Sequence, residues 1–200
     1  ARRFALGGVT VEGDLDAPLL AMGDRRRSLR EEVEAQGGRP GTVPEDTPSV
    51  VIGRSGQAPG KGVAVTFEGW RGGVVPLTAP RLAEVTKVIP AAVLAGAFAA
   101  AEAFAMLRGE AEAGHRSPGL SLWRPDRAND WLGQGCDGPE PAGLPNHLWV
   151  LGLGHLGQAF LWTLLLCPYR HPAEVTLVLQ DTDIVTPSTD STSVLTQATM

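Results

Sequence analysis

Cysteine is nearly absent from this chain, which has only Cys136 and Cys167. Two cysteines cannot form the disulfide framework of a small secreted domain, and these two match no C-x-x-C metal-binding motif. We expect no signal peptide either, because Arg2 and Arg3 are followed by no apolar core segment. The sequence therefore predicts a cytoplasmic protein in a reducing compartment.

Positive charge is also scarce: 17 lysine and arginine residues stand against 22 aspartate and glutamate residues, with a pI near 5.4. This balance argues against attraction to nucleic acid or to an anionic membrane surface. The basic run 25–27 stands beside Glu31, Glu32 and Glu34, so we interpret it as part of a solvated helix with local ion pairs. We expect neither nucleic acid nor a membrane as a partner.

Long hydrophobic runs are missing apart from residues 88–107, VIPAAVLAGAFAAAEAFAML. Alanine dominates this run, Pro90 lies near its start, and Glu102 would cost a few kcal/mol in lipid. The run is therefore predicted to be a buried helix of a soluble α/β domain rather than a membrane span.

The 200 residues are enough for a real core, since 43% of them are hydrophobic. Residues 1–115 are predicted to form an N-terminal α+β region, with short strands at 50–52, 62–67 and 74–75. Residues 116–146 are rich in Gly, Pro and Trp and are predicted to be a connecting segment. Residues 147–200 are predicted to begin a Rossmann-like α/β unit.

The most informative stretch is residues 148–183, LWVLGLGHLGQAFLWTLLLCPYRHPAEVTLVLQDTD. An apolar run leads into the pattern G-x-G-x-x-G, which is followed by helically spaced apolar residues, a closing proline and a second apolar run. The first glycine permits a tight turn, the second lets the backbone approach a phosphate, and the third lets the helix pack closely on the strand. The start of the helix offers N–H groups and partial positive charge to an anion.

Two acidic residues end the second apolar run, about 24 and 26 residues beyond the last glycine, roughly where a ribose-binding carboxylate is expected. His155 lies within the turn, where it either approaches a phosphate or points to solvent beside the start of the helix. The predicted nucleotide-binding residues are Gly152, Gly154, His155, Leu156, Gly157, Asp181 and Asp183. No catalytic residue and no metal ligand is assigned.

The segments WVLGLGHLGQAF and VTLVLQDTDIV resemble the opening of the ThiF/MoeB/HesA adenylating domain, the Rossmann-like fold shared with ubiquitin-activating enzymes. That family reads V-x-G-x-G-G-x-G, a helix, and a strand ending in D-x-D-x-V, and the three glycines, both aspartates and Val185 fall on those positions. The resemblance implies ATP with Mg as the cofactor. It also implies a homodimer and a ubiquitin-like or sulfur-carrier protein whose C-terminus would be adenylated.

Residues 87–110 resemble the apolar helix that closes such domains. On that interpretation, residues 1–115 would be a partial or degenerate ThiF-like half. The alternative is an alanine-rich core helix with no such kinship.

The chain departs from that family at residues 186–193, TPSTDSTS, where Thr189, Thr192 and Ser193 stand in place of Asn, Arg and Gln. A hydroxyl supplies neither the charge nor the reach of an arginine. The family's metal-binding aspartate and its lysine would follow beyond Met200, which favours a fragment of a longer protein. Whether the protein is an ATP-dependent adenylyltransferase therefore stays open, beside two alternatives: an inactive docking or dimerisation module, and an NAD- or FAD-binding oxidoreductase.

Overall fold

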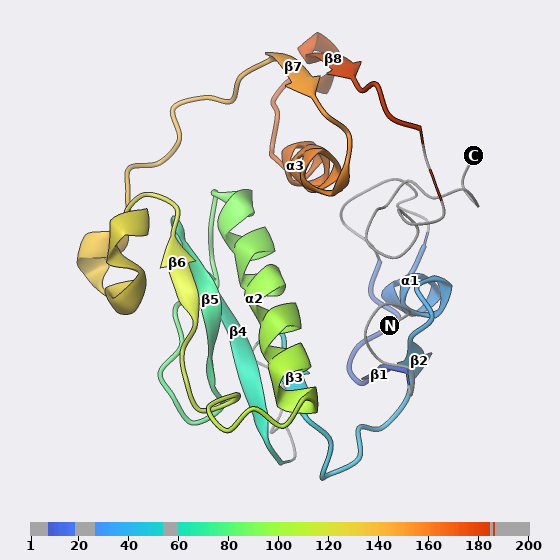
Figure 1. Ribbon diagram of the computed structural model, residues 1–200, viewed down its shortest axis with the longest axis vertical. Helices are drawn as coiled ribbons and strands as arrows, with labels where there is room; N and C mark the ends of the chain where they lie inside the picture. Colours follow the sequence, from blue (N-terminus) through green and yellow to red (C-terminus); the bar gives the residue numbers. More distant parts are fainter. Residues whose placement is uncertain (1–7, 19–26, 54–59, 185, 187–200) are drawn as a thin grey trace. The chain divides into compact units, whose positions relative to one another are not determined.

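The computed structural model describes residues 8–18, 27–53, 60–184 and 186. The chain divides into two compact units, Ala1–Glu140 and Pro141–Met200. Both units combine helices with strands (Figure 1), so the predicted α/β class is confirmed at this level.

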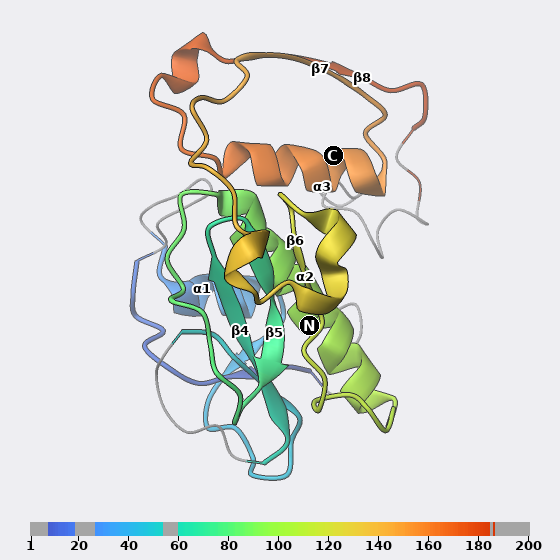
Figure 2. The same ribbon diagram turned by 90° about the vertical axis from the view of Figure 1, so that its left-hand side faces the viewer.

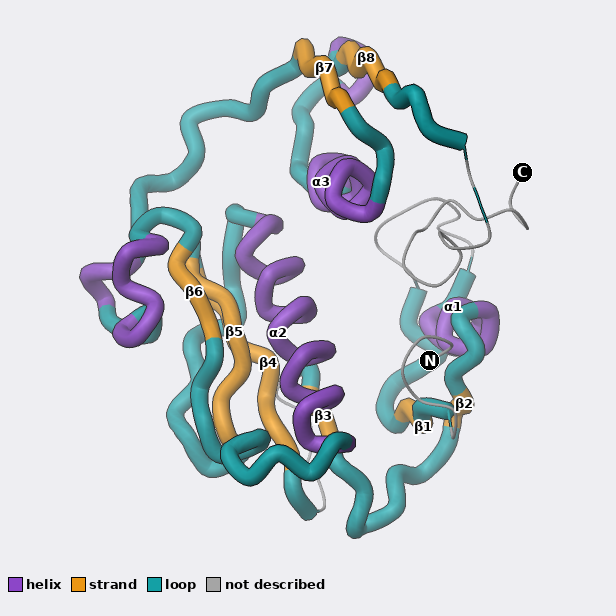
Figure 3. The backbone as a smooth tube through the Cα atoms, viewed as in Figure 1, coloured by secondary structure: helices purple, strands orange, loops and turns teal. Residues whose placement is uncertain are grey.

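A four-stranded sheet in the order β3-β4-β5-β6 forms the centre of the first unit (Figure 3). Its strands are β3 (Ser49–Val51), β4 (Gly62–Glu68), β5 (Arg71–Pro76) and β6 (Gly119–Ser121). β3 runs parallel to β4, whereas the pairs β4–β5 and β5–β6 are antiparallel. The predicted strands near residues 50, 65 and 75 are present as β3, β4 and β5.

Helix α2 (Ile89–Leu107) covers one face of this sheet (Figure 1). Side chains alternate between the two faces of a strand, so Val63 and Val65 of β4 join the core that contains Ala95 and Ala99 of α2. Gly72 of β5 lets α2 lie close to the sheet, because a Cβ there would lie 2.1 Å from the carbonyl oxygen of Ala91. α2 is long and apolar enough to cross a membrane, a test that the core helix of a soluble protein also passes.

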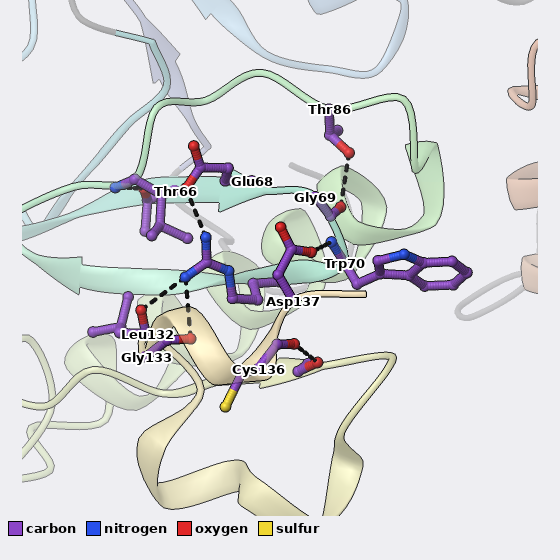
Figure 4. Close-up of polar contacts among 12 residues, drawn as sticks. Thr66, Glu68, Gly69, Trp70, Thr86, Leu132, Gly133, Cys136 and Asp137 are labelled. Carbon is purple, nitrogen blue, oxygen red and sulfur yellow. Dashed lines mark hydrogen bonds and ion pairs between the residues drawn. The ribbon is translucent and has the colours of Figure 1, made fainter. Parts of the chain in front are cut away.

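The opposite face of the sheet is covered by a segment with short 3₁₀ helices and no long helix. Ala64 and Val75 pack there with Trp131, which is 2% exposed and follows a short 3₁₀ helix, Pro125–Asp130. Arg71 Nη1 donates to the carbonyl oxygens of Leu132 at 2.8 Å and Gly133 at 3.3 Å. Figure 4 labels these two acceptor residues. Much of the predicted connecting segment is therefore folded onto the sheet.

Three smaller elements lie nearer the N-terminus. β1 (Thr10–Val11) and β2 (Arg39–Pro40) form a short parallel pair, and α1 (Leu29–Ala35) lies between them in the sequence. Ser28 caps α1: its hydroxyl accepts from the Glu31 N–H, and the Glu31 carboxylate accepts from the Ser28 N–H. No residue of α1 is buried, so the predicted solvated helix is present.

The second unit contains β7 (His147–Leu151), α3 (His155–Leu165), a 3₁₀ turn (Pro172–Glu174) and β8 (Thr176–Gln180). β7 and β8 are parallel, with His147 opposite Thr176 and Leu151 opposite Gln180. The predicted order of strand, glycine turn, helix and strand is therefore present, and Figure 2 shows α3 beside the two strands.

Candidate functional site

Each glycine of the turn between β7 and α3 has a different geometric role. Gly152 has φ +89°, a left-handed backbone that favours glycine. A Cβ on Gly157 would lie 1.8 Å from the carbonyl oxygen of Gly152, so only glycine allows this approach of helix to turn. A Cβ on Gly154 would meet nothing within 4 Å, which leaves open space beside the backbone at the start of α3.

Both backbone polar groups of Leu153, its N–H and its carbonyl oxygen, are hydrogen-bonded to side chains. Its N–H donates to Asp181 Oδ2 at the end of β8, and its carbonyl oxygen accepts from Gln158 Nε2 at 2.8 Å. The Gly152 N–H donates to the carbonyl oxygen of Gln180 at 2.8 Å and continues the β7–β8 pairing into the turn. These bonds fix the glycine turn against both flanking elements.

The two aspartates at the end of β8 differ in what they bind. Asp181 accepts from Leu153 through one oxygen and from the Asp183 N–H through the other, at 2.8 Å. Donation from the Asp183 N–H and then from the Leu153 N–H lowers the pKa of the Asp181 carboxyl below its usual 3.8. Both oxygens of Asp181 therefore accept from backbone N–H groups, whereas Asp183 is exposed two residues further along the chain.

The start of α3 lies at the surface of the second unit. Gly154 is its N-cap residue, and a glycine has no side chain that could accept from the first N–H groups of the helix. Gly154, His155 and Leu156 are all exposed, with the Leu156 side chain 87% exposed. Partial positive charge at such a helix start stabilises an anion.

The structure thus brings all seven predicted residues into one region of the second unit, the turn and the adjoining end of β8. Sequence reasoning missed Gln158, which is 6% exposed and holds the turn through the carbonyl of Leu153. The signal was present, since Gln158 is a polar residue directly after the third glycine of the motif. Val185 and the positions Thr189, Thr192 and Ser193 lie outside the described residues.

Both cysteine thiols donate to backbone carbonyl oxygens. Cys136 is 1% exposed, and its Sγ donates to the carbonyl oxygen of Asp130 at 3.1 Å. Burial raises the pKa of the Cys167 thiol, whose Sγ donates to the carbonyl oxygen of Thr163 at 3.3 Å. Over the described ranges, no three His, Cys, Asp or Glu residues are grouped closely enough to hold a metal ion.

Comparison with known proteins gives matches over both parts of the chain. The family model of the BilD N-terminal domain matches residues 1–122, and that of the BilD C-terminal domain matches residues 144–200. The bacterial E1-like protein BilD of Collimonas sp. (strain OK412) is 45% identical in an alignment of 199 residues, which covers 97% of this chain and 43% of that protein. The chain thus spans less than half the length of this relative. No solved structure matches.

These matches correct the family drawn from the glycine and aspartate motifs. The matching models are those of BilD, with none of the ThiF/MoeB/HesA family, so that assignment is wrong, and the adenylating function taken from it has no support. The motif misled because any strand–turn–helix unit that closes on a glycine turn meets the same geometric demands. Since the two domain models cover nearly the whole chain in N-terminal to C-terminal order, the chain belongs to the BilD family.

Proposed function

We propose that this chain is the nucleotide-binding part of an E1-like protein, and that its second unit binds an adenine nucleotide at the glycine turn. The observation that carries the proposal is the fixed Leu153 backbone beside a helix start whose N-cap residue is a glycine with open space around it. A turn held in place before the ligand arrives loses little conformational freedom on binding. The Collimonas relative is named a bacterial E1-like protein, which supports the same proposal.

In this proposal the strand–turn–helix–strand unit acts as a Rossmann-like βαβ element. Phosphate oxygens would lie over Gly154 and the first turn of α3, where a backbone without a Cβ allows close approach. Asp183, which is exposed, would accept hydrogen bonds from the ribose hydroxyls, while Asp181 holds the turn through backbone N–H groups. A magnesium ion arriving with ATP would be held mainly by phosphate oxygens and water.

The macromolecular partner in this proposal is a ubiquitin-like protein, the kind of protein on which an E1 acts. The homodimer and the cytoplasmic setting stay predictions.

The test is calorimetric titration of the protein with ATP, AMP, NAD and FAD. We expect adenine nucleotides to bind in the micromolar range, and Asp183→Asn to weaken binding by about tenfold through loss of a charge-assisted hydrogen bond. Glu174→Gln is the matched control, since it also removes one exposed carboxylate of the second unit. Absence of ATP and AMP binding at millimolar concentration, or equal losses in both variants, would contradict the proposal.

A further inference from the structure

A short acidic segment of the first unit, residues 137–140 (Asp-Gly-Pro-Glu), lies against the turn between β4 and β5. We call this segment the latch. Asp137 Oδ1 accepts from the backbone N–H of Trp70 at 2.9 Å (Figure 4). The indole Nε1–H of Trp70 donates to the carbonyl oxygen of Pro139 at 2.7 Å. The latch is therefore held through the side chain of Asp137 and the backbone carbonyl of Pro139.

Two tryptophans and a lysine form the surface beneath the latch. The rings of Trp70 and Trp123 are tilted by 47° with centroids 5.6 Å apart. A Cβ on Gly138 would lie 2.6 Å from Trp123 ring atoms and 2.9 Å from Trp70 Cδ1, so the backbone at this glycine lies directly against both rings. Lys87 Nζ completes the surface, 2.8 Å from both carboxylate oxygens of Glu140.

The segment that occupies this surface has its shape set by proline. Gly138 precedes Pro139 and Glu140 precedes Pro141, and a residue before proline favours extended backbone over helix. Aromatic surfaces commonly bind extended proline-containing segments in this way, because little conformational freedom is lost. This surface offers aromatic rings, an indole N–H directed at a proline carbonyl, and a cation that faces a carboxylate. Together these groups favour an acidic Gly-Pro sequence.

We propose that Trp70, Trp123 and Lys87 form a peptide-binding site for an acidic Gly-Pro segment, which the latch fills as a releasable strap. The ion pair at its end is exposed, with Lys87 and Glu140 side chains 73% and 72% exposed, so water competes for it. With the latch bound, the connection to the second unit is residues 141–144, because the carbonyl oxygens of Pro145 and Asn146 accept from Tyr169 and Thr176. Release extends it to residues 137–144, which adds about 13 Å of reach.

The backbone N–H of Trp70 reports directly on the latch, because its acceptor is Asp137. In Gly138→Ala the new Cβ meets the tryptophan rings, and we expect hydrogen exchange at the Trp70 amide to rise by about tenfold or more. Gly143→Ala is the matched control, because a Cβ there meets nothing within 4 Å, and exchange should be unchanged. Unchanged exchange in Gly138→Ala would overturn the proposal.

Binding from solution is the second arm of the experiment. A synthetic peptide DGPEPA, the sequence of residues 137–142, should restore Trp70 protection in Gly138→Ala at millimolar concentration, whereas NGPQPA should not. Lys87→Ala should weaken the effect of the peptide. Failure of DGPEPA, or equal effects of the two peptides, would overturn the proposal. If Gly138→Ala fails to fold, Asp137→Ala takes its place, with the Trp70 indole N–H resonance as the readout and the same criteria for the peptides.

Discussion

The tightest approach in the glycine turn lies at Gly157, and Gly157→Ala tests whether that approach closes the turn. A Cβ at this position would lie 1.8 Å from the carbonyl oxygen of Gly152, whereas real Cβ contacts are essentially never under 3.0 Å. Helix and turn must therefore separate by roughly 1 Å. Gly152 is not free to retreat, because its N–H donates to the carbonyl oxygen of Gln180 at 2.8 Å.

Two effects of opposite sign decide the result. Alanine favours a helix over glycine by about 1 kcal/mol. Forcing the helix away from the turn costs about 2–4 kcal/mol through overpacking and weakened hydrogen bonds. The steric effect should win, so we expect the free energy of local opening of α3 to fall by about 1–3 kcal/mol.

The assay is native-state hydrogen exchange of the amides in β7 and α3, compared with Gly154→Ala. Gly154 has φ −67° and open space around its Cβ direction, so its alanine variant should change local stability by less than about 1 kcal/mol. That variant should nevertheless weaken nucleotide binding, since its methyl group occupies the space assigned to phosphate. If the amides of Gly157→Ala are as well protected from hydrogen exchange as those of the unmodified chain, the steric reasoning is refuted. Helix propensity alone predicts that result.

Three further predictions concern carboxylates. Asp181→Asn should raise hydrogen exchange at the Leu153 amide and also weaken ATP binding. Asp183→Asn should weaken ATP binding and leave exchange at Leu153 unchanged. The same change in Leu153 exchange in both variants would contradict these separate roles. Because the pKa of Asp181 is lowered, protection of Leu153 should be constant at neutral pH and lost only as the pH falls below about 3.8, measured by exchange across a pH series; loss above pH 5 would contradict it. Glu102, 2% exposed, accepts from the Gly114 N–H and pairs with Arg116 Nη2 at 3.0 Å, so Glu102→Ala should lower the free energy of unfolding by about 2 kcal/mol in urea titrations. Glu102→Gln, which keeps an acceptor for Gly114, should lose less, and equal losses would show that this backbone hydrogen bond contributes nothing.

The motifs alone could not identify the family to which the chain belongs. The glycines and aspartates of residues 148–183 describe a turn that approaches an anion, and unrelated families meet that need with the same residues. The inference from motif to local geometry was sound, because Gly152 and Gly157 are where only glycine fits. The inference from motif to ThiF/MoeB/HesA was not, since the matching family models are those of BilD.

The sequence alone determined the local elements of this protein. The order of β7, α3 and β8 follows from apolar spacing and glycine, and the solvated α1 follows from its charges, because these constraints act between residues a few positions apart. Only the tertiary structure decided which distant groups meet: Asp181 with the Leu153 N–H, Arg71 with the Leu132 carbonyl, and Asp137 with the Trp70 N–H. Each is a hydrogen bond between a side chain and a backbone group far away along the chain. Such bonds leave no periodic trace in a sequence, because any residue can supply the backbone partner.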